Sequence, residues 1–296
     1  MNTNTDIYER NNVRVLGSMG PPLILAHGFG SEQRAWRHQV AAFKDRYQII
    51  LFDHVGCGRS DFNAYSSERY GSLQGYAEDL LEICEELDVR DATLVGHSMS
   101  GMVGLLAALA EPKRFRQLAF VKSSPRFLND VGYKGGFEQP ELEALFASMS
   151  ANFHSWAAGF AKLVMNAPHM PELAQEFSQT LSHMRPDMSL AIARVVFESD
   201  FRDLLPRLKH PTLVLQSGED FAVPDEVGLY MARRIPLAQL ARIEAKGHLP
   251  HLSSPAAVNQ ALDDFLSGRP PRDARGATAL LDGVPRRSVP MGEHLQ

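Results

Sequence analysis

The fold is decided by the segment Val95–Gly101, which reads V-G-H-S-M-S-G. It joins a short apolar run to a segment of small apolar residues, and this pattern predicts a strand followed directly by a buried helix. A serine at such a junction lies on a tight turn, where its neighbours must be small to avoid clashes. Gly96, Ser100 and Gly101 meet this need, although Ser100 replaces the last glycine of the strict G-x-S-x-G pattern. The segment therefore predicts a nucleophilic Ser98.

Similar apolar runs recur along the chain, with helix-like segments between them. Each run is apolar throughout instead of alternating, as expected of central strands that are covered on both faces. Strands and helices in alternation indicate an α/β fold with a mostly parallel, doubly wound sheet. The expected strands are residues 23–26, 48–52, 92–95, 118–121, 212–215 and 240–243, and the main expected helices are residues 33–43, 72–87, 99–110 and 255–266.

Residues 127–200 interrupt this alternation, because they carry helical patterns and no strand pattern. They are rich in Phe and Met and follow the carboxyl end of a predicted strand, where open α/β sheets bind ligands. We therefore predict a helical cap over a ligand site, with an ordinary buried core as the alternative. The α/β core then consists of residues 1–126 and 201–267. Residues 268–296 have repeated Pro, Gly and Arg without periodicity and are predicted to form a disordered or loosely docked tail.

The base and the acid that a serine nucleophile needs lie further along the chain. Asp220 follows the fifth apolar run and His248 follows the sixth. Strand ends of a parallel sheet meet at one edge, and the order Ser, Asp, His is the one that this elbow motif requires. We therefore predict that His248 removes the proton of Ser98 and that Asp220 orients the imidazole. Glu219 and His251 are the rival acid and base, and we read both as residues without a catalytic role.

An oxyanion that forms during such a reaction needs donors already in place. The backbone N–H of Met99, directly after the nucleophile, is one expected donor. The other is the N–H of Phe29, which lies in a loop between two glycines that let the backbone turn toward the site. His27 and His97 flank the site and are interpreted as structural residues.

Composition excludes several classes of function. The net charge of −5 argues against nucleic acid and anionic membranes as partners. The Gly-x-Gly within residues 53–60 lacks the Lys-Ser/Thr of a phosphate-binding loop, so we predict a structural turn there. No cluster has the spacing of a zinc site, and no metal or cofactor is expected. The two cysteines, the polar N-terminal residues and the lack of a long apolar run predict a cytoplasmic protein with reduced thiols.

Several separated motifs resemble one family when they are taken together. They are HGFGSEQRAW at residues 27–36, LFDHVGCGRSD at 51–61, GHSMSG at 96–101, QSGEDFAVP at 216–224 and KGHLPHLS at 246–253. In this order and spacing they resemble the RsbQ-type α/β hydrolases, the family of a bacterial stress-signalling protein and of the plant strigolactone and karrikin receptors. The resemblance runs from about Asn11 to Leu266, and it places the sequence in the α/β-hydrolase fold.

The resemblance implies a cap of four helices in a V shape over an enclosed apolar pocket. It maps the family's triad onto Ser98, Asp220 and His248, and its oxyanion donors onto Phe29 and Met99. It also implies a small apolar carbonyl ligand, and in the bacterial family member the hydrolase works with a regulatory protein, a sensor phosphatase. The pocket residues that we expect are His97, Phe137, Trp156, Phe160, Phe197, Val223 and Leu249.

Three functions are compatible with these residues. The first is a serine hydrolase that acts on a small apolar ester or lactone, in which the same reaction can also serve signalling. The second is a ligand-sensing regulator of a sensor phosphatase or similar partner, with little turnover. The third is a carbon–carbon bond hydrolase, which also uses serine. Dehalogenases and epoxide hydrolases are disfavoured, because their nucleophile is a carboxylate and residue 98 is serine.

Overall fold

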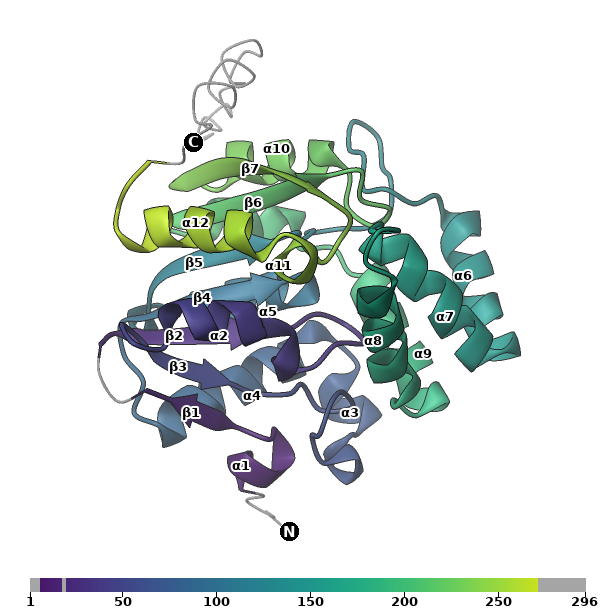
Figure 1. The fold of residues 1–296 in the computed structure, drawn as a ribbon, viewed down its shortest axis with the longest axis horizontal. Helices are drawn as coiled ribbons and strands as arrows, with labels where there is room; N and C mark the ends of the chain where they lie inside the picture. Colours follow the sequence, from purple (N-terminus) through teal and green to yellow (C-terminus); the bar gives the residue numbers. More distant parts are fainter. Residues whose placement is uncertain (1–5, 18–19, 271–296) are drawn as a thin grey trace, which may run out of the picture.

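A seven-stranded sheet lies at the centre of the part of the chain that the structure describes (Figure 1). This computed structural model describes residues 6–17 and 20–270. The strands are β1 (Arg14–Leu16), β2 (Pro22–Ala26), β3 (Gln48–Leu51), β4 (Ala92–His97), β5 (Phe115–Val121), β6 (Thr212–Gly218) and β7 (Ala238–Lys246). Their order is β1-β3-β2-β4-β5-β6-β7, and all neighbours are parallel except β1 and β3. The predicted mostly parallel α/β sheet is confirmed.

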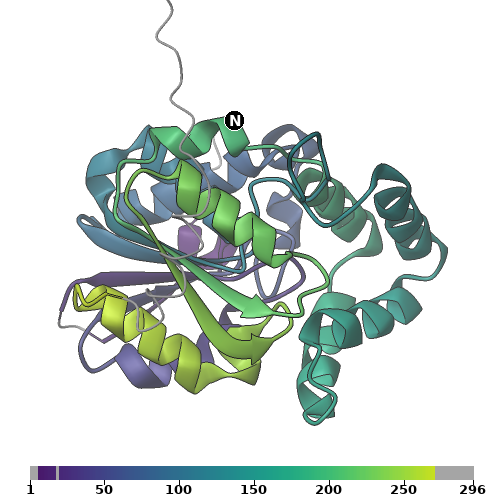
Figure 2. The same cartoon turned by 90° about the horizontal axis from the view of Figure 1, so that it is seen from above.

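Helices connect the strands and cover both faces of the sheet (Figures 1 and 2). The α-helices are α1 (Ile7–Arg10), α2 (Arg37–Phe43), α3 (Ser67–Tyr70), α4 (Leu73–Glu86), α5 (Met99–Ala110), α6 (Gln139–Ala151), α7 (Phe153–Met165), α8 (Pro171–Ser182), α9 (Pro186–Phe197), α10 (Asp225–Arg234), α11 (Pro250–Ser253) and α12 (Pro255–Leu266). Short 3-10 helices η1 (Gln33–Trp36), η2 (Phe62–Ala64), η3 (Pro112–Arg114) and η4 (Arg202–Arg207) complete the connections.

The two faces of the sheet form two hydrophobic cores. Leu23 and Leu25 of β2 pack in the core under α2 and α12, whereas Ile24 and Ala26 pack in the core that includes α4 and α5. All four side chains are buried. Because successive strand residues point to opposite faces, a strand buried on both sides must be apolar at every position. This is the physical origin of the continuous apolar runs in the sequence.

The edge strands are where the sequence prediction and the structure differ. Strand β1 is absent from the prediction, because it has three residues and two of them are exposed. Strand β7 continues to Lys246, three residues beyond the predicted end, and its burial alternates over that part. The exposed residues of these edge strands interrupt the apolar runs that identify the central strands.

The insertion between β5 and β6 holds helices α6 to α9 within residues 127–200, all of which the structure describes. α7 packs against α8, and α6 packs against α9. Figure 2 shows these helices together at one end of the sheet. The division of the chain into core and cap stays a prediction, and the predicted tail falls mostly on residues 271–296, outside the described residues.

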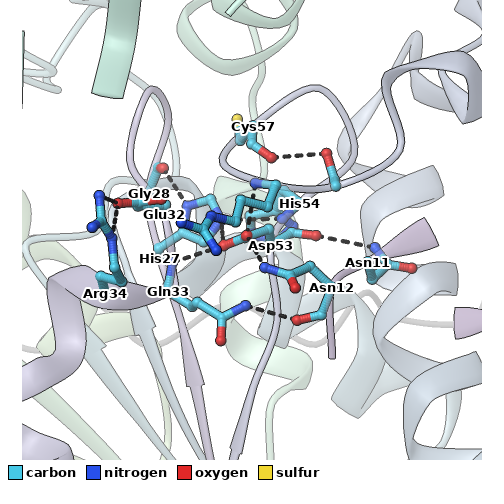
Figure 3. A network of polar contacts seen from close by, with 12 residues as sticks. Asn11, Asn12, His27, Gly28, Glu32, Gln33, Arg34, Asp53, His54 and Cys57 are labelled. Atoms are coloured by element: carbon cyan, nitrogen blue, oxygen red, sulfur yellow. Dashed lines mark hydrogen bonds and ion pairs between the residues drawn. The ribbon is translucent and has the colours of Figure 1, made fainter. Parts of the chain in front are cut away.

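A buried polar network supports the loops at the carboxyl edge of the sheet (Figure 3). Asp53, fully buried, accepts hydrogen bonds from the N–H of Gln33 at 2.7 Å, the N–H of Arg59 at 2.9 Å and the amide of Asn12 at 2.7 Å. The backbone of residues 54–57 makes a turn, with the N–H of Cys57 donating to the carbonyl of His54. The Gly-x-Gly segment is therefore a structural turn wrapped around Asp53, as predicted.

Gly58 is the residue of this turn that a side chain would disturb most. Its φ is +56°, and a Cβ there would lie 2.5 Å from the carboxyl carbon of Asp53. We expect Gly58→Ala to lower the free energy of unfolding by about 3 kcal/mol, through left-handed strain and displacement of Asp53. Gly132→Ala is the control, because Gly132 has φ +72° and no atom near its Cβ position. It should cost about 1 kcal/mol. Equal losses for both variants in urea unfolding would contradict the role given to Asp53.

Candidate active site

Ser98 lies on a strained turn between β4 and α5. Its φ is +54° and its ψ is −120°, a conformation that L-residues rarely adopt. A Cβ at Gly96 would lie 2.4 Å from the carbonyl oxygen of Ser100, and one at Gly101 would lie 2.2 Å from the hydroxyl of Ser123. The glycines are therefore required by close packing, and residue 100 can be serine because its side chain points elsewhere. The turn holds the Ser98 side chain at the carboxyl edge of the sheet.

The structure brings Ser98, His248 and Asp220 into one hydrogen-bonded chain. His248 Nε2 is 2.9 Å from Ser98 Oγ, and His248 Nδ1 is 2.8 Å from Asp220 Oδ2. The three residues follow β4, β7 and β6, so the shared strand edge brings together positions up to 150 residues apart. Ser98 and His248 keep only 6% and 7% exposure, and the Asp220 side chain is fully buried. This geometry is that of a nucleophile, a base and an orienting carboxylate.

His248 is held by α7 as well as by the sheet. Its N–H donates to the carbonyl of Val164 in α7 at 2.7 Å. Its own carbonyl is 2.8 Å from Nε2 of His97. Gly247 has φ +79°, and a Cβ there would lie 2.2 Å from the carbonyl oxygen of Met165. The end of α7 therefore fixes the loop that carries the imidazole.

The rival acid and base lie apart from Ser98. Glu219 has an exposed side chain that pairs with Lys246 at 2.7 Å. His251 is buried between the rings of Trp36 and His97, at centroid distances of 4.6 and 4.5 Å. Among the described residues, neither nitrogen of His251 has a hydrogen-bond partner. Burial first, and the nearby His248 second, lower the pKa of His251 to about 3.

A second serine–histidine pair lies below the elbow. Ser100 Oγ is 2.7 Å from His54 Nε2, and it donates to the carbonyl of His27. Because the hydroxyl proton is used in that bond, His54 must donate its Nε2–H to Ser100 and has no lone pair there to act as a base. Ser100 is fully buried. We read this pair as structural, and the same holds for His27, whose Nε2 accepts from the N–H of His54 at 3.1 Å.

The two expected oxyanion donors lie at the ends of segments that meet at Ser98. Met99 is the first residue of α5. Gly28, next to Phe29, lies so close that a Cβ would be 3.0 Å from the Cβ of Ser98. Phe29 lies on the wall of the cavity that contains Ser98. These positions fit the predicted backbone donors, and their catalytic role stays a prediction.

The cavity above Ser98 is small and aromatic. Its volume is about 20 Å³. Four of the seven predicted pocket residues lie on its wall, namely His97, Phe160, Phe197 and Leu249. A larger hollow of about 630 Å³ between α7 and α8 contains no member of the triad, and another of about 380 Å³ is bordered by Asp220 but by neither Ser98 nor His248. The wall residues that sequence reasoning missed are Phe127, Val164, Phe177, Val196 and Ala222.

Three predicted pocket residues lie outside this wall. Trp156 stacks on the far side of Phe160, with ring centroids 4.9 Å apart, and borders a separate surface groove of about 420 Å³. Phe137 packs against Phe197 at 5.7 Å, one layer behind the cavity. Val223 is buried, and its carbonyl accepts a hydrogen bond from Lys122. None of the three borders the small cavity that contains Ser98, and their role in a substrate pocket stays a prediction.

Lys122 is a site residue that sequence reasoning missed. It follows directly after β5, it is fully buried, and its Nζ is 3.2 Å from Asp220 Oδ2. The available signal was a lysine at the end of an apolar run, on the sheet edge that carries the predicted triad. A lysine is rarely buried without a partner, so its position among strand ends marks a charge pair.

Asp220 is held in its ionised form by its neighbours. Burial raises the pKa of its carboxyl, but the charge and hydrogen bond of His248 and the charge of Lys122 outweigh burial and lower the pKa to about 2. The N–H of Ala222 adds a hydrogen bond to Oδ1 at 2.8 Å. An ionised carboxylate fixes the Nδ1–H tautomer of His248, which leaves Nε2 free to accept the serine proton.

The described residues contain neither a metal-site cluster nor a membrane-spanning helix. No group of three or more His, Cys, Asp or Glu side chains in residues 6–17 and 20–270 is arranged to hold a metal ion. In the same residues, no helix has both the length and the apolar character needed to cross a membrane.

Comparison with known proteins identifies the class of this protein. The sequence model of the alpha/beta hydrolase fold matches residues 21–255, and the chain belongs to this family. It is 42% identical to the karrikin insensitive 2 receptor CA of Petunia hybrida over 85% of this chain and 94% of that one. It is 41% identical to the strigolactone esterase D14 of Arabidopsis thaliana over 87% and 96% of the two chains. The resemblance inferred from the motifs is confirmed.

Solved structures agree with this assignment. The structure of olei00960, a hydrolase from Oleispira antarctica, matches with a TM-score of 0.86 at 37% identity, over 88% of this chain and 96% of that one. The chain is therefore an α/β hydrolase, with relatives that are named esterases and receptors.

Replacement of Asp220 by Asn gives a pH-dependent loss of stability. Because the pKa of Asp220 is about 2, below its usual 3.8, its contribution is present above pH 4 and fades as the pH falls toward 2. We expect Asp220→Asn to lower the free energy of unfolding by on the order of 2 kcal/mol at pH 7, and by less at pH 3. Urea unfolding at both pH values measures the difference. Glu219→Gln, the adjacent exposed carboxylate, should change it by less than about 0.5 kcal/mol. A loss for Asp220→Asn that is the same at both pH values would argue against an ionised, paired Asp220.

Proposed function

We propose that this protein is a serine hydrolase that cleaves a small apolar ester or lactone. The proposal depends on one observation, the continuous hydrogen-bonded chain from Ser98 Oγ through His248 to Asp220. The turn that carries Ser98, the small cavity above it and the esterases among the relatives support the same reading.

The reaction follows from the positions of these groups. Ser98 Oγ attacks the carbonyl carbon while His248 Nε2 accepts the hydroxyl proton, and the carbonyl π electrons move to the oxygen. The N–H groups of Phe29 and Met99 bind this oxyanion. On collapse, the ester C–O bond breaks and His248 gives the proton to the leaving oxygen. Water then repeats the sequence on the acyl-enzyme and releases the acid. In a lactone, the leaving oxygen stays attached to the acyl chain.

The substrate class follows from the cavity wall. Phenylalanines dominate the wall, and the polar groups lie at its base with Ser98 and His248. Such a wall favours an apolar ligand with one reactive carbonyl. Pockets that bind small molecules usually exceed roughly 300 Å³, far above the 20 Å³ found here. Substrate entry therefore requires that cap side chains or cap helices move.

This need for movement favours a second, compatible role in ligand sensing. A cap that must open for the ligand has two states, and a partner can distinguish them. The receptor named among the relatives adds to this reading. We therefore include a regulatory protein partner in the proposal, and a cytoplasmic location in which buried Cys57 and Cys84 stay reduced. Ligand-dependent partner binding with very slow turnover would identify the sensing role, and product analysis on a diketone would identify a carbon–carbon bond hydrolase.

The identity of the nucleophile can be tested against its neighbour. Ser98→Ala should lower the hydrolysis of p-nitrophenyl acetate by about a thousandfold or more, because the attacking oxygen is lost. It should also abolish labelling by a fluorophosphonate. Ser100→Ala is the matched control and should keep the labelling at Ser98, since Ser100 has no base. Labelling and hydrolysis that survive in Ser98→Ala would refute the proposed function.

The cavity wall can be tested with esters of increasing acyl length. Phe177→Ala removes a ring of α8 from the wall, so we expect the ratio of kcat/KM for hexanoate over acetate to rise by about tenfold. Phe146→Ala is the control, because Phe146 is buried in the cap but lies outside the wall. It should lower stability without changing the ratio. An equal change of the ratio in both variants would show that the cavity above Ser98 does not select the acyl group.

A further inference from the structure

Lys122 occupies an unusual position at the end of β5. Its φ is +50°, a left-handed conformation that a long side chain rarely adopts. Its N–H donates to the carbonyl of Leu215 in β6 at 3.0 Å, which continues the pairing of the two strands. The side chain is fully buried. A strained backbone and a buried charge both cost free energy, so the surrounding contacts must compensate for them.

The ammonium group of Lys122 lies among oxygens at the end of β6. Nζ is 2.8 Å from Gln216 Oε1, 3.0 Å from the carbonyls of Ser217 and Val223, and 3.2 Å from Asp220 Oδ2. All of these atoms are acceptors, and an ammonium group has three donors and no acceptor. The site therefore fits the protonated form. Burial lowers the pKa of Lys122, and Asp220 acts in the opposite direction.

The same oxygen of Asp220 serves both Lys122 and the catalytic imidazole. Oδ2 is 3.2 Å from Lys122 Nζ and 2.8 Å from His248 Nδ1, while Oδ1 accepts from the N–H of Ala222. The two distances to Oδ2 limit the separation of Nζ and Nδ1 to about 6 Å. At this range a unit charge in a buried site shifts a proton equilibrium by about one unit or more.

We propose that Lys122 is a positioning residue of the hydrolase site, which holds Asp220 Oδ2 toward His248 and offsets part of the carboxylate charge. The proposal rests on the proposed function. This role of Lys122 affects His248, the catalytic base. The imidazolium that forms when His248 takes the proton of Ser98 lies near the fixed ammonium group of Lys122. Lys122 therefore favours the neutral imidazole, which is the form that accepts the serine proton. The site keeps its active form at lower pH than it would with Asp220 alone.

The other charged groups near the triad are paired with each other, exposed or neutral. We therefore assign the electrostatic effect on the imidazole of His248 to Lys122. Asp225 of α10 and Arg242 of β7 act on Lys122 with opposite signs, and they pair with each other. Lys246 and Glu219 form an exposed pair. The rings of His97 and His251 contribute no positive charge at neutral pH, because burial lowers the pKa of both.

The pH dependence of hydrolysis tests this role. Lys122→Met and Lys122→Gln both remove the charge, and the glutamine keeps a donor. We expect the acid limb of kcat/KM against pH to move up by about one pH unit in both, which is about a tenfold lower rate on that limb. Lys246→Met also removes one positive charge close to the triad, but on an exposed side chain. Solvent screens that charge, so its acid limb should stay within about 0.2 unit of the wild type. The hydrolysis rate of each variant is divided by the fraction of its sites that a fluorophosphonate labels, so that only folded, active protein is compared.

The outcomes separate this proposal from the proposed function. Hydrolysis that persists in Ser98→Ala refutes the proposed function. Hydrolysis that depends on Ser98, with acid limbs unchanged in both Lys122 variants, overturns only the role of Lys122. If both variants fail to fold, Lys122→Met combined with Asp220→Asn gives the answer, because neither charge then stays buried without a partner. The combined variant should show the cooperative unfolding transition that Lys122→Met then lacks, and a failure to recover this transition would contradict the pairing.

Discussion

The strained turn at Ser98 is the constraint on which the rest of the site depends. Its φ of +54° and ψ of −120° persist only because the surroundings determine the backbone more strongly than local preference does. The N–H of Ser98 is fixed by the carbonyl of Val121 in β5, and the glycines at 96 and 101 allow β4, α5 and β5 to approach closely. A parallel sheet covered on both faces supplies the rigidity. The turn between β4 and α5 thereby places Ser98 on the wall of the cavity.

Around this turn the sheet edge carries several buried polar groups that have close hydrogen-bond partners. Asp53 is saturated by backbone and amide donors, Ser100 by two histidine contacts, and Lys122 by oxygens from β6 and the following loop. A buried charge without such partners would cost several kcal/mol. The layer below Ser98 is therefore held by hydrogen bonds, and the imidazole of His248 lies beside the paired charges of Asp220 and Lys122.

The sequence predicts the sheet and the triad because both depend on local signals. Apolar runs mark the strands, and a catalytic residue directly after a run is placed by topology alone, as for Asp220 and His248. The rest depends on packing. Trp156 and Phe160 lie on one face of α7 at i and i+4, so no spacing rule says which ring faces Ser98 and which stacks behind it. Lys122 was missed because two of its four partners are backbone carbonyls, which the sequence does not distinguish. Strand β1 was missed because an exposed edge has no apolar pattern.

Helix α7 and the catalytic base are linked by a hydrogen bond, and this limits how the cavity can open. α7 contributes Phe160 and Val164 to the cavity wall, and the carbonyl of Val164 also accepts the N–H of His248. A displacement of α7 would therefore move the imidazole away from Ser98 Oγ, where 2.9 Å leaves little tolerance for proton transfer. The wall residues on α8 and α9, Phe177, Val196 and Phe197, have no such bond to the triad. Movement of α8 and α9 would therefore make room for a substrate with the least disturbance of the triad. Helix α7 would stay in place and keep His248 next to Ser98.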